Sequence, residues 1–236
     1  MTCITDISMH PEWTASQTDI YLAPTQEIKR HLIKEGTRAE DILVTGIPVR
    51  QQFLDADCRQ KRERNRTRRV LIMGGGLGLM PDLKELLEKL HSMQGVESVV
   101  ITGKNHKMYE EWVNRYEDVE VLGYTENISR YMRGADLVIT KAGGITLFEI
   151  LHSQVPLFVI HPFLEQEMNN ARYAAEKGFA KVIWGRREDY IPELEKLLSD
   201  EKMMEEMTGN VRRACKEMIE ISLDEAVGIM EERMTA

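Results

Sequence analysis

The sequence predicts an α/β protein built around a doubly wound parallel sheet. Short segments rich in Val, Ile and Leu alternate with amphipathic segments between residues 19 and 183. Several of the short segments are apolar on both faces, which is typical of central parallel strands covered by helices on either side. Strands and helices that alternate in this way connect through right-handed crossovers and build an open sheet.

The expected strands are short, and glycines lie at several of the points where one element gives way to the next. The strands cover residues 19–22, 42–45, 69–73, 98–102, 119–122, 137–140, 156–160 and 180–183. Apolar residues recur at helical spacing within residues 83–90, 145–152 and 168–175. From Ile191 onward the chain is acidic and helical, with a Met-rich stripe that we interpret as core packing. A terminal helix is expected over residues 222–233.

Composition and charge exclude several classes of protein. The 236 residues are 42% hydrophobic and 30% charged, which is an ordinary globular composition rather than a collagen-like or disordered one. The formal charge of −8 gives no support for nucleic-acid binding. No apolar run reaches the length of about 20 residues that a membrane span needs, and the first residues do not form a signal peptide. We therefore expect a cytoplasmic protein whose cysteines, Cys3, Cys58 and Cys215, are reduced thiols.

One basic segment interrupts the alternation. Residues 57–69 are highly charged and mostly basic. A patch for nucleic acid or lipid headgroups is one interpretation. We favour a solvated connector between two strands, because the segment has no aromatic side chains on which bases would stack.

A glycine-rich turn follows the expected strand at 69–73. Residues 73–79 read Met-Gly-Gly-Gly-Leu-Gly-Leu. Glycines let a backbone approach a ligand closely, and amides at a helix start favour an anion. Gly78 is followed by Leu79 and Met80, so the turn is not a Walker A loop. The third glycine of a dinucleotide fingerprint is missing, and the next strand does not end in an acidic residue, so NAD is not expected.

A second glycine turn follows the expected strand at 137–140. Its amides and the Thr146 hydroxyl suit a diphosphate at a helix N-terminus, and Glu149 suits the two hydroxyls of a ribose. The alternative is a tight turn with a Glu that the helix dipole favours. The residues alone leave these two interpretations equal.

Two further groups of polar residues follow strands. Gln166, Glu167 and Asn170 come after the strand at 156–160 and suit the hydroxyls of a sugar, or else they cap the next helix. Arg50 emerges from a Gly-Ile-Pro-Val turn after the strand at 42–45 and suits a phosphate. Because ligands bind outside the carboxyl ends of strands in an open α/β sheet, we expect all four groups to converge at one edge.

In combination, these segments resemble glycosyltransferase family 28, specifically the C-terminal, donor-binding half of its two-domain GT-B fold. The likeness is to its monogalactosyldiacylglycerol synthases and processive diacylglycerol glucosyltransferases. It rests on segments that run from residue 5 to residue 178. They are Thr5-Asp6 with His10 and Trp13, residues 46–50, 73–78, 103–105 and 141–146, Glu149, and Gln166-Glu167 with Asn170.

The resemblance implies a fold, an activity and a set of roles. The sheet is expected to be Rossmann-like, with residues 1–18 as a remnant of the acceptor domain and linker, 19–218 as the donor-binding domain and 219–236 as a C-terminal helix. The implied reaction is inverting transfer of a hexose from a UDP-sugar to a lipid acceptor, with no cofactor and no obligatory metal. The donor-binding residues are expected to be Arg50, Gly75, Gly76, Leu77, Gly103, Tyr124, Thr125, Lys141, Gly143, Gly144, Ile145, Thr146, Glu149, Gln166, Glu167 and Asn170.

Among these, the resemblance assigns Arg50 and the 75–77 backbone to the diphosphate, Tyr124 and Thr125 to the uracil, and Glu149 to the ribose. Asp6 and His10 are catalytic candidates, although the principal base is expected in an acceptor domain that precedes this sequence in full members. The chain is therefore expected to be inactive alone, with UDP-glucose, UDP-galactose or UDP-N-acetylglucosamine as donor and peripheral membrane association by analogy. Alternatives are the donor-binding subunit of a split N-acetylglucosaminyltransferase and a non-catalytic nucleotide-binding module.

Overall fold

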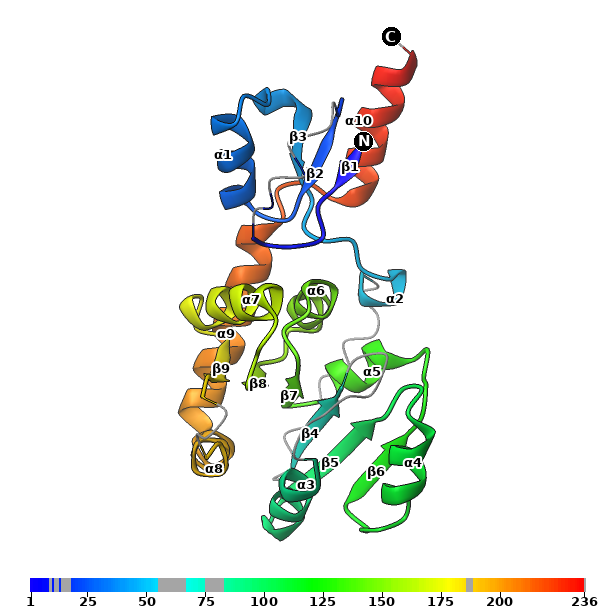
Figure 1. Ribbon diagram of the computed structural model, residues 1–236, viewed down its shortest axis with the longest axis vertical. Coiled ribbons are helices and arrows are strands. Elements are labelled where there is room, and N and C mark those ends of the chain that lie inside the picture. Colours follow the sequence, from blue (N-terminus) through cyan, green and yellow to red (C-terminus); the bar gives the residue numbers. More distant parts are fainter. Residues whose placement is uncertain are drawn as a thin grey trace.

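The computed structural model shows two parallel β-sheets, one of six strands and one of three (Figure 1). It describes residues 1–8, 10, 13, 18–54, 67–74, 83–185 and 189–235. Within that part of the chain, no helix has both the length and the apolar character needed to cross a membrane. Among the described residues neither Cys3 nor Cys215 forms a disulfide, as expected, and Cys58 lies outside the described part of the chain.

The larger sheet has the strand order β6-β5-β4-β7-β8-β9, and every pair of neighbours is parallel. Its strands are β4 (Arg68–Met73), β5 (Val96–Ile101), β6 (Val119–Leu122), β7 (Leu137–Thr140), β8 (Leu157–Ile160) and β9 (Ala180–Ile183). The chain runs outward from β4 to β6 and then returns to β7 on the other side of β4. This reversal confirms the doubly wound, Rossmann-like class and places the topological switch point between β4 and β7.

Helices cover both faces of this sheet because its central strands are apolar on both sides. Along β4, Leu71 and Met73 pack into one core cluster, whereas Val70 and Ile72 pack into the other. The helices of this unit are α3 (Leu83–Ser92), α4 (His106–Trp112), α5 (Ile128–Arg133), α6 (Gly144–Ser153), α7 (Glu165–Glu176), α8 (Ile191–Ser199) and α9 (Glu201–Met218). The expected helical segments at 83–90, 145–152 and 168–175 are confirmed, and Met204, Met207 and Met218 are core residues.

The smaller sheet corrects one expectation about the order of strands. The segments expected at 19–22 and 42–45 form strands, but they pair with each other, and the first also pairs with an unexpected strand at the N-terminus, instead of joining the main sheet. This sheet contains β1 (Thr2–Cys3), β2 (Tyr21–Ala23) and β3 (Ile42–Val44). After β3 the chain turns at Gly46, whose φ is +75°, and enters the short helix α2 (Gln51–Leu54), so β4 begins a new sheet.

The three-stranded sheet has its own core. Helix α1 (Gln26–Lys34) buries Ile28 and Leu32 against one face, and α10 (Leu223–Thr235) buries Ala226 against Ile20 and Leu22 on the other. Figure 1 shows α9 leading up from the larger sheet to α10, which lies beside the smaller sheet. The terminal helix is therefore confirmed, while the expected domain limits at residues 18 and 218 stay a prediction.

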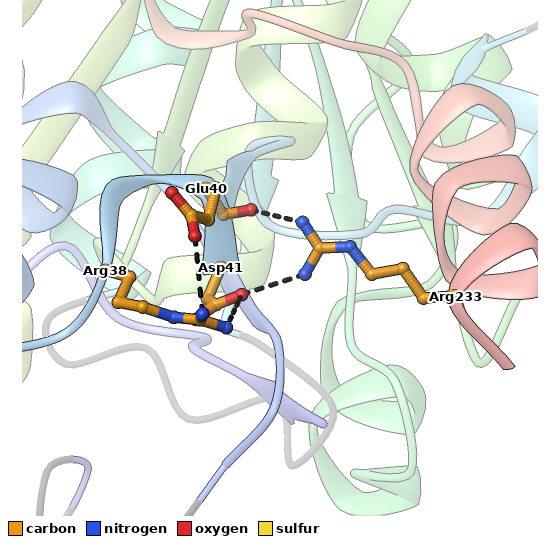
Figure 2. A network of polar contacts seen from close by, with 4 residues as sticks. All are labelled: Arg38, Glu40, Asp41 and Arg233. Carbon is orange, nitrogen blue, oxygen red and sulfur yellow. Dashed lines mark hydrogen bonds and ion pairs between the residues drawn. The ribbon is translucent and has the colours of Figure 1, made fainter. Parts of the chain in front are cut away.

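One ion pair and one hydrogen bond to a carbonyl oxygen, both from Arg233, hold α10 to the residues that lead into β3 (Figure 2). Arg233 donates from Nη1 to Asp41 Oδ1 at 2.9 Å and from Nη2 to the Glu40 carbonyl oxygen at 2.7 Å. Arg38 donates from Nε to Asp41 Oδ2 at 2.7 Å. The hydrogen bond from Arg38, followed by that from Arg233, holds the pKa of buried Asp41 below its usual value.

The chain crosses between the two sheets twice, and the crossings touch. The Val44 carbonyl oxygen accepts hydrogen bonds from the amides of Glu220 and Ile221 at 3.0 and 3.2 Å. Gly46 lies so close to Phe148 that a Cβ at this position would stand 2.8 Å from the Phe148 ring. A side chain at residue 46 would therefore force the crossing away from α6.

Candidate functional site

The centre of the candidate site is a buried carboxylate on α6 that pairs with an arginine from the crossing segment. Glu149 is 6% exposed, and its Oε1 accepts a hydrogen bond from Arg50 Nη2 at 3.0 Å. Burial raises the pKa of Glu149, and Arg50 opposes that rise. The helix dipole favours an acidic side chain only in the first turn of a helix. Helix α6 begins at Gly144, so Glu149 lies beyond that turn. The interpretation of this Glu as a dipole-favoured residue is therefore not supported.

The start of α6 presents backbone amides that no described side chain caps. Gly143 is the N-cap residue, and it makes no side-chain capping bond. The first amides of a helix lack partners within the helix, so they suit an anion here. Gly144 is buried against the main chain of Thr5, where a Cβ would collide with the Thr5 carbonyl oxygen. Ile145 is exposed and Thr146 is partly buried within the same turn.

The residues expected at the sugar lie at the start of α7, beside the start of α6. Asn170 is fully buried, and its Nδ2 donates to the Ala142 carbonyl oxygen at 2.7 Å. Among the described residues, its Oδ1 has no hydrogen-bond partner, nor does the buried Oε2 of Glu167. The N-cap residue of α7 is Leu164, and no side chain caps the helix, so the alternative role of these residues as caps is not supported. Gln166 is exposed.

The remaining expected donor residues lie at the carboxyl ends of three strands. Gly103 follows β5, is buried and has a φ of +58°. Tyr124 follows β6 and is 66% exposed, and the neighbouring Thr125 Oγ1 accepts a hydrogen bond from the Asn127 amide at 3.1 Å. Lys141 follows β7, and its Nζ lies 5.3 Å from the centre of the Phe163 ring.

The two catalytic candidates make local turn contacts. Asp6 Oδ1 accepts a hydrogen bond from the Ser8 amide at 3.1 Å. The His10 carbonyl oxygen accepts one from the Trp13 amide at 3.1 Å, and the two rings lie 6.4 Å apart. Asp6 directly follows the residue that packs on Gly144, which brings this segment to the start of α6. Its catalytic role stays a prediction.

Some expected residues lie outside the described part of the chain. Gly75, Gly76 and Leu77 belong to this group, as does most of the basic segment at 57–69. The sequence Asp55-Ala56-Asp57, an Asp-x-Asp pattern of the kind that suits divalent cations, also falls there. Among the described residues, no group of three or more His, Cys, Asp or Glu side chains is placed to hold a metal ion.

The sequence analysis missed two residues at this edge. His161 directly follows β8 with a φ of +48°, and its buried Nε2 has no hydrogen-bond partner in the part of the chain that the structure describes. A His immediately before Pro at the end of a strand was the available signal. Gln52 on α2 donates from Nε2 to the Glu126 carbonyl oxygen at 2.8 Å, and no sequence pattern singles it out.

Comparisons with known proteins show which families the chain is similar to. Residues 69–221 match the glycosyltransferase family 28 C-terminal domain, and residues 1–49 match the monogalactosyldiacylglycerol (MGDG) synthase family. A processive diacylglycerol beta-glucosyltransferase of Bacillus licheniformis is 35% identical, and the match covers 89% of this chain and 57% of that protein. The protein of the same name from Bacillus subtilis is 33% identical with the same coverage. The chain thus spans little more than half the length of these relatives.

Solved structures support the fold. MurG of Acinetobacter baumannii has a TM-score of 0.69 at 15% identity, and the match covers 98% of this chain and 66% of that one. The glycotransferase of kitacinnamycin has a TM-score of 0.68 at 20% identity, covering 91% and 55%. The fold is that of the C-terminal half of a GT-B protein. The matched domain covers well over half of the chain, and the chain belongs to glycosyltransferase family 28.

Proposed function

We propose that this chain is the donor-binding half of a glycosyltransferase that moves a hexose from a UDP-sugar to a diacylglycerol-type lipid. The observation that carries the proposal is the buried Glu149, which lies on the same helix as the uncapped amides expected to bind a diphosphate. Carboxylates are rarely buried without a partner, and the partner of Glu149 is Arg50 from the crossing segment. The Arg50 side chain is 46% exposed, so this ion pair reaches the protein surface. The names of the relatives support the lipid acceptor.

The chemistry follows from the roles of these groups. The first amides of α6 bind the diphosphate, the Glu149 carboxylate accepts hydrogen bonds from the ribose hydroxyls, and Gln166, Glu167 and Asn170 bind the hexose. A hydroxyl of the acceptor attacks the anomeric carbon with inversion while UDP leaves. The amides and the helix dipole stabilise the charge that develops on the departing diphosphate.

We further propose that the acceptor is bound largely by residues beyond these 236, and that the chain alone transfers no sugar. The relatives are longer than the matched region. Asp6 and His10 remain the candidates from this chain for contact with the acceptor hydroxyl. Peripheral association with the cytoplasmic face of a membrane would suit a lipid acceptor, and it can be measured by vesicle flotation.

Calorimetric titration of the full chain tests the donor role. We expect UDP to bind, and Glu149→Ala to weaken UDP binding by about 1–3 kcal/mol, because the ribose diol loses its acceptor. Replacing Gln166 and Asn170 by Ala should weaken binding of UDP-glucose more than binding of UDP. No detectable binding of UDP to the folded wild-type chain would refute the proposal.

The choice of sugar separates the alternatives. UDP-glucose, UDP-galactose and UDP-N-acetylglucosamine are titrated side by side, and the names of the relatives favour UDP-glucose. A clear preference for UDP-N-acetylglucosamine would favour the subunit of a split N-acetylglucosaminyltransferase. Equal binding of UDP and all three UDP-sugars would favour a nucleotide-binding module without transferase activity.

A further inference from the structure

A single short segment contacts two parts of the proposed nucleoside site. Arg50 directly precedes α2 and reaches Glu149, the proposed ribose ligand, at 3.0 Å. Two residues later, Gln52 donates to the Glu126 carbonyl oxygen at 2.8 Å, in the loop that carries Tyr124 and Thr125. These are the two residues that the resemblance assigns to the uracil. Residues 50–54 therefore link the ribose and base sides of the proposed site.

This segment is itself firmly held. Phe53 is 2% exposed in the core of the larger unit, and its carbonyl oxygen accepts a hydrogen bond from Arg133 Nη2 at 2.7 Å. Ser129 Oγ donates to Gln52 Oε1 at 2.8 Å, so both ends of the Gln52 amide are bonded. The guanidinium carbon of Arg50 lies 5.5 Å from the centre of the Phe53 ring, a cation–π arrangement that restricts its orientation.

We propose that Arg50 and Gln52 are positioning residues of the nucleoside site: Arg50 orients the Glu149 carboxylate for the ribose hydroxyls, and Gln52 holds the loop 123–127 at the base. The proposal rests on the donor role described above and assigns Arg50 a function that needs no phosphate. If Arg50 contacted only the diphosphate, its replacement would not change the binding of a nucleoside that has no phosphates.

The physical argument for Arg50 concerns the charge state and direction of a buried acid. An ionised carboxylate is the acceptor that a diol requires, and burial disfavours that charge. Among the described residues, Arg50 Nη2 donates to the Oε1 oxygen of this carboxylate at 3.0 Å. The ion pair therefore offsets part of the penalty that burial places on the charge and fixes the direction of the carboxylate before a ligand arrives, which lowers the cost of ordering the site on binding.

Uridine is the probe that separates positioning from phosphate contact. Binding of uridine, 2′-deoxyuridine and UDP to the full chain is measured by ligand-observed NMR and calorimetry. We expect Arg50→Gln to weaken the binding of uridine by about tenfold, as for a lost hydrogen bond to a charged group, and to weaken the binding of 2′-deoxyuridine by clearly less. Arg50→Lys should recover part of the loss. In a double-mutant cycle, Glu149→Gln should abolish most of the effect of Arg50→Gln.

A matched control and a second variant keep the test decisive. Arg115 also stacks on an aromatic ring, that of Trp112 at 4.6 Å, and Arg115→Gln should leave uridine binding unchanged. Gln52→Ala should weaken the binding of uridine and of 2′-deoxyuridine by the same factor, because Gln52 contacts the loop expected at the base, which both nucleosides share. Circular dichroism and urea unfolding verify that each variant is folded.

The outcomes separate this inference from the donor role. If wild type binds UDP and uridine but Arg50→Gln weakens only UDP, Arg50 is a phosphate contact and the inference is overturned. Equal losses for uridine and 2′-deoxyuridine in Arg50→Gln would also overturn it. If folded wild type binds neither UDP nor uridine, the donor role itself fails.

Discussion

Replacement of Arg233 by Leu tests how strongly the terminal helix is attached to the smaller sheet. The substitution removes the hydrogen bonds to Asp41 and to the Glu40 carbonyl oxygen, at 2.9 and 2.7 Å. Asp41 keeps Arg38 as a partner, so no buried charge is left alone. A hydrogen bond to a charged group contributes about 1.5–3 kcal/mol. Because the Arg233 side chain is 39% exposed, screening reduces the loss to about 1–2 kcal/mol.

Urea unfolding followed by circular dichroism measures this loss. Arg30→Leu is the control, since Arg30 pairs with Glu27 on an exposed helix face and should contribute less than about 0.5 kcal/mol. The pKa of Asp41 is depressed in the folded state, so its pairing contributes stability at pH values above its unfolded pKa of about 3.9. The difference between wild type and Arg233→Leu should therefore shrink as the pH falls through the folded pKa. A variant as stable as Arg30→Leu at pH 7 would refute this account of the attachment.

Three further predictions concern the site. The pKa of Glu149 is raised, so uridine binding should begin to weaken at a higher pH than it would with an ordinary Glu as the pH falls. The affinity of Glu149→Gln for uridine should lack this loss at acidic pH. Gly144→Ala should lower the free energy of unfolding by about 1–3 kcal/mol and weaken UDP binding, because the Cβ meets the Thr5 backbone; an unchanged urea midpoint would contradict the close contact. Asn170→Asp should destabilise the fold by about 1–3 kcal/mol, since it replaces the donor to the Ala142 carbonyl oxygen by an acceptor, and thermal unfolding that matches wild type would argue against that hydrogen bond.

The positions of β2 to β9 could be predicted from the sequence, because each is a largely apolar run bounded by turn residues. The partners of β2 and β3 could not. A pattern of hydrophobicity indicates that a segment is a strand but does not specify its neighbour, and β1, which pairs with β2, has only two residues, Thr2 and Cys3. The turn at Gly46, which ends this sheet, is recognisable as a turn but not as a boundary between sheets.

The candidate site was predictable in part for the same reason. Glu149 and Asn170 follow strands, and the shared edge of parallel strands makes their proximity a consequence of topology. The ion pair between Arg50 and Glu149 joins residues 99 positions apart, and it depends on how α2 docks on α5 and α6. The contact of Gln52 with the Glu126 carbonyl oxygen depends on that docking too. Side-chain pairing across such a separation leaves no periodic trace in a sequence.

The double crossing between the sheets has a mechanical consequence. One connector would let the two units swivel, slide and tilt independently. Here the outgoing and returning connectors are bonded to each other through the Val44 carbonyl, and Gly46 is wedged against Phe148. Such a joint resists sliding and torsion while it allows bending about the line that runs through both connectors. Any change in the angle between the two sheets is thereby channelled into a single direction, and Arg50, which is four residues from Gly46, would move least.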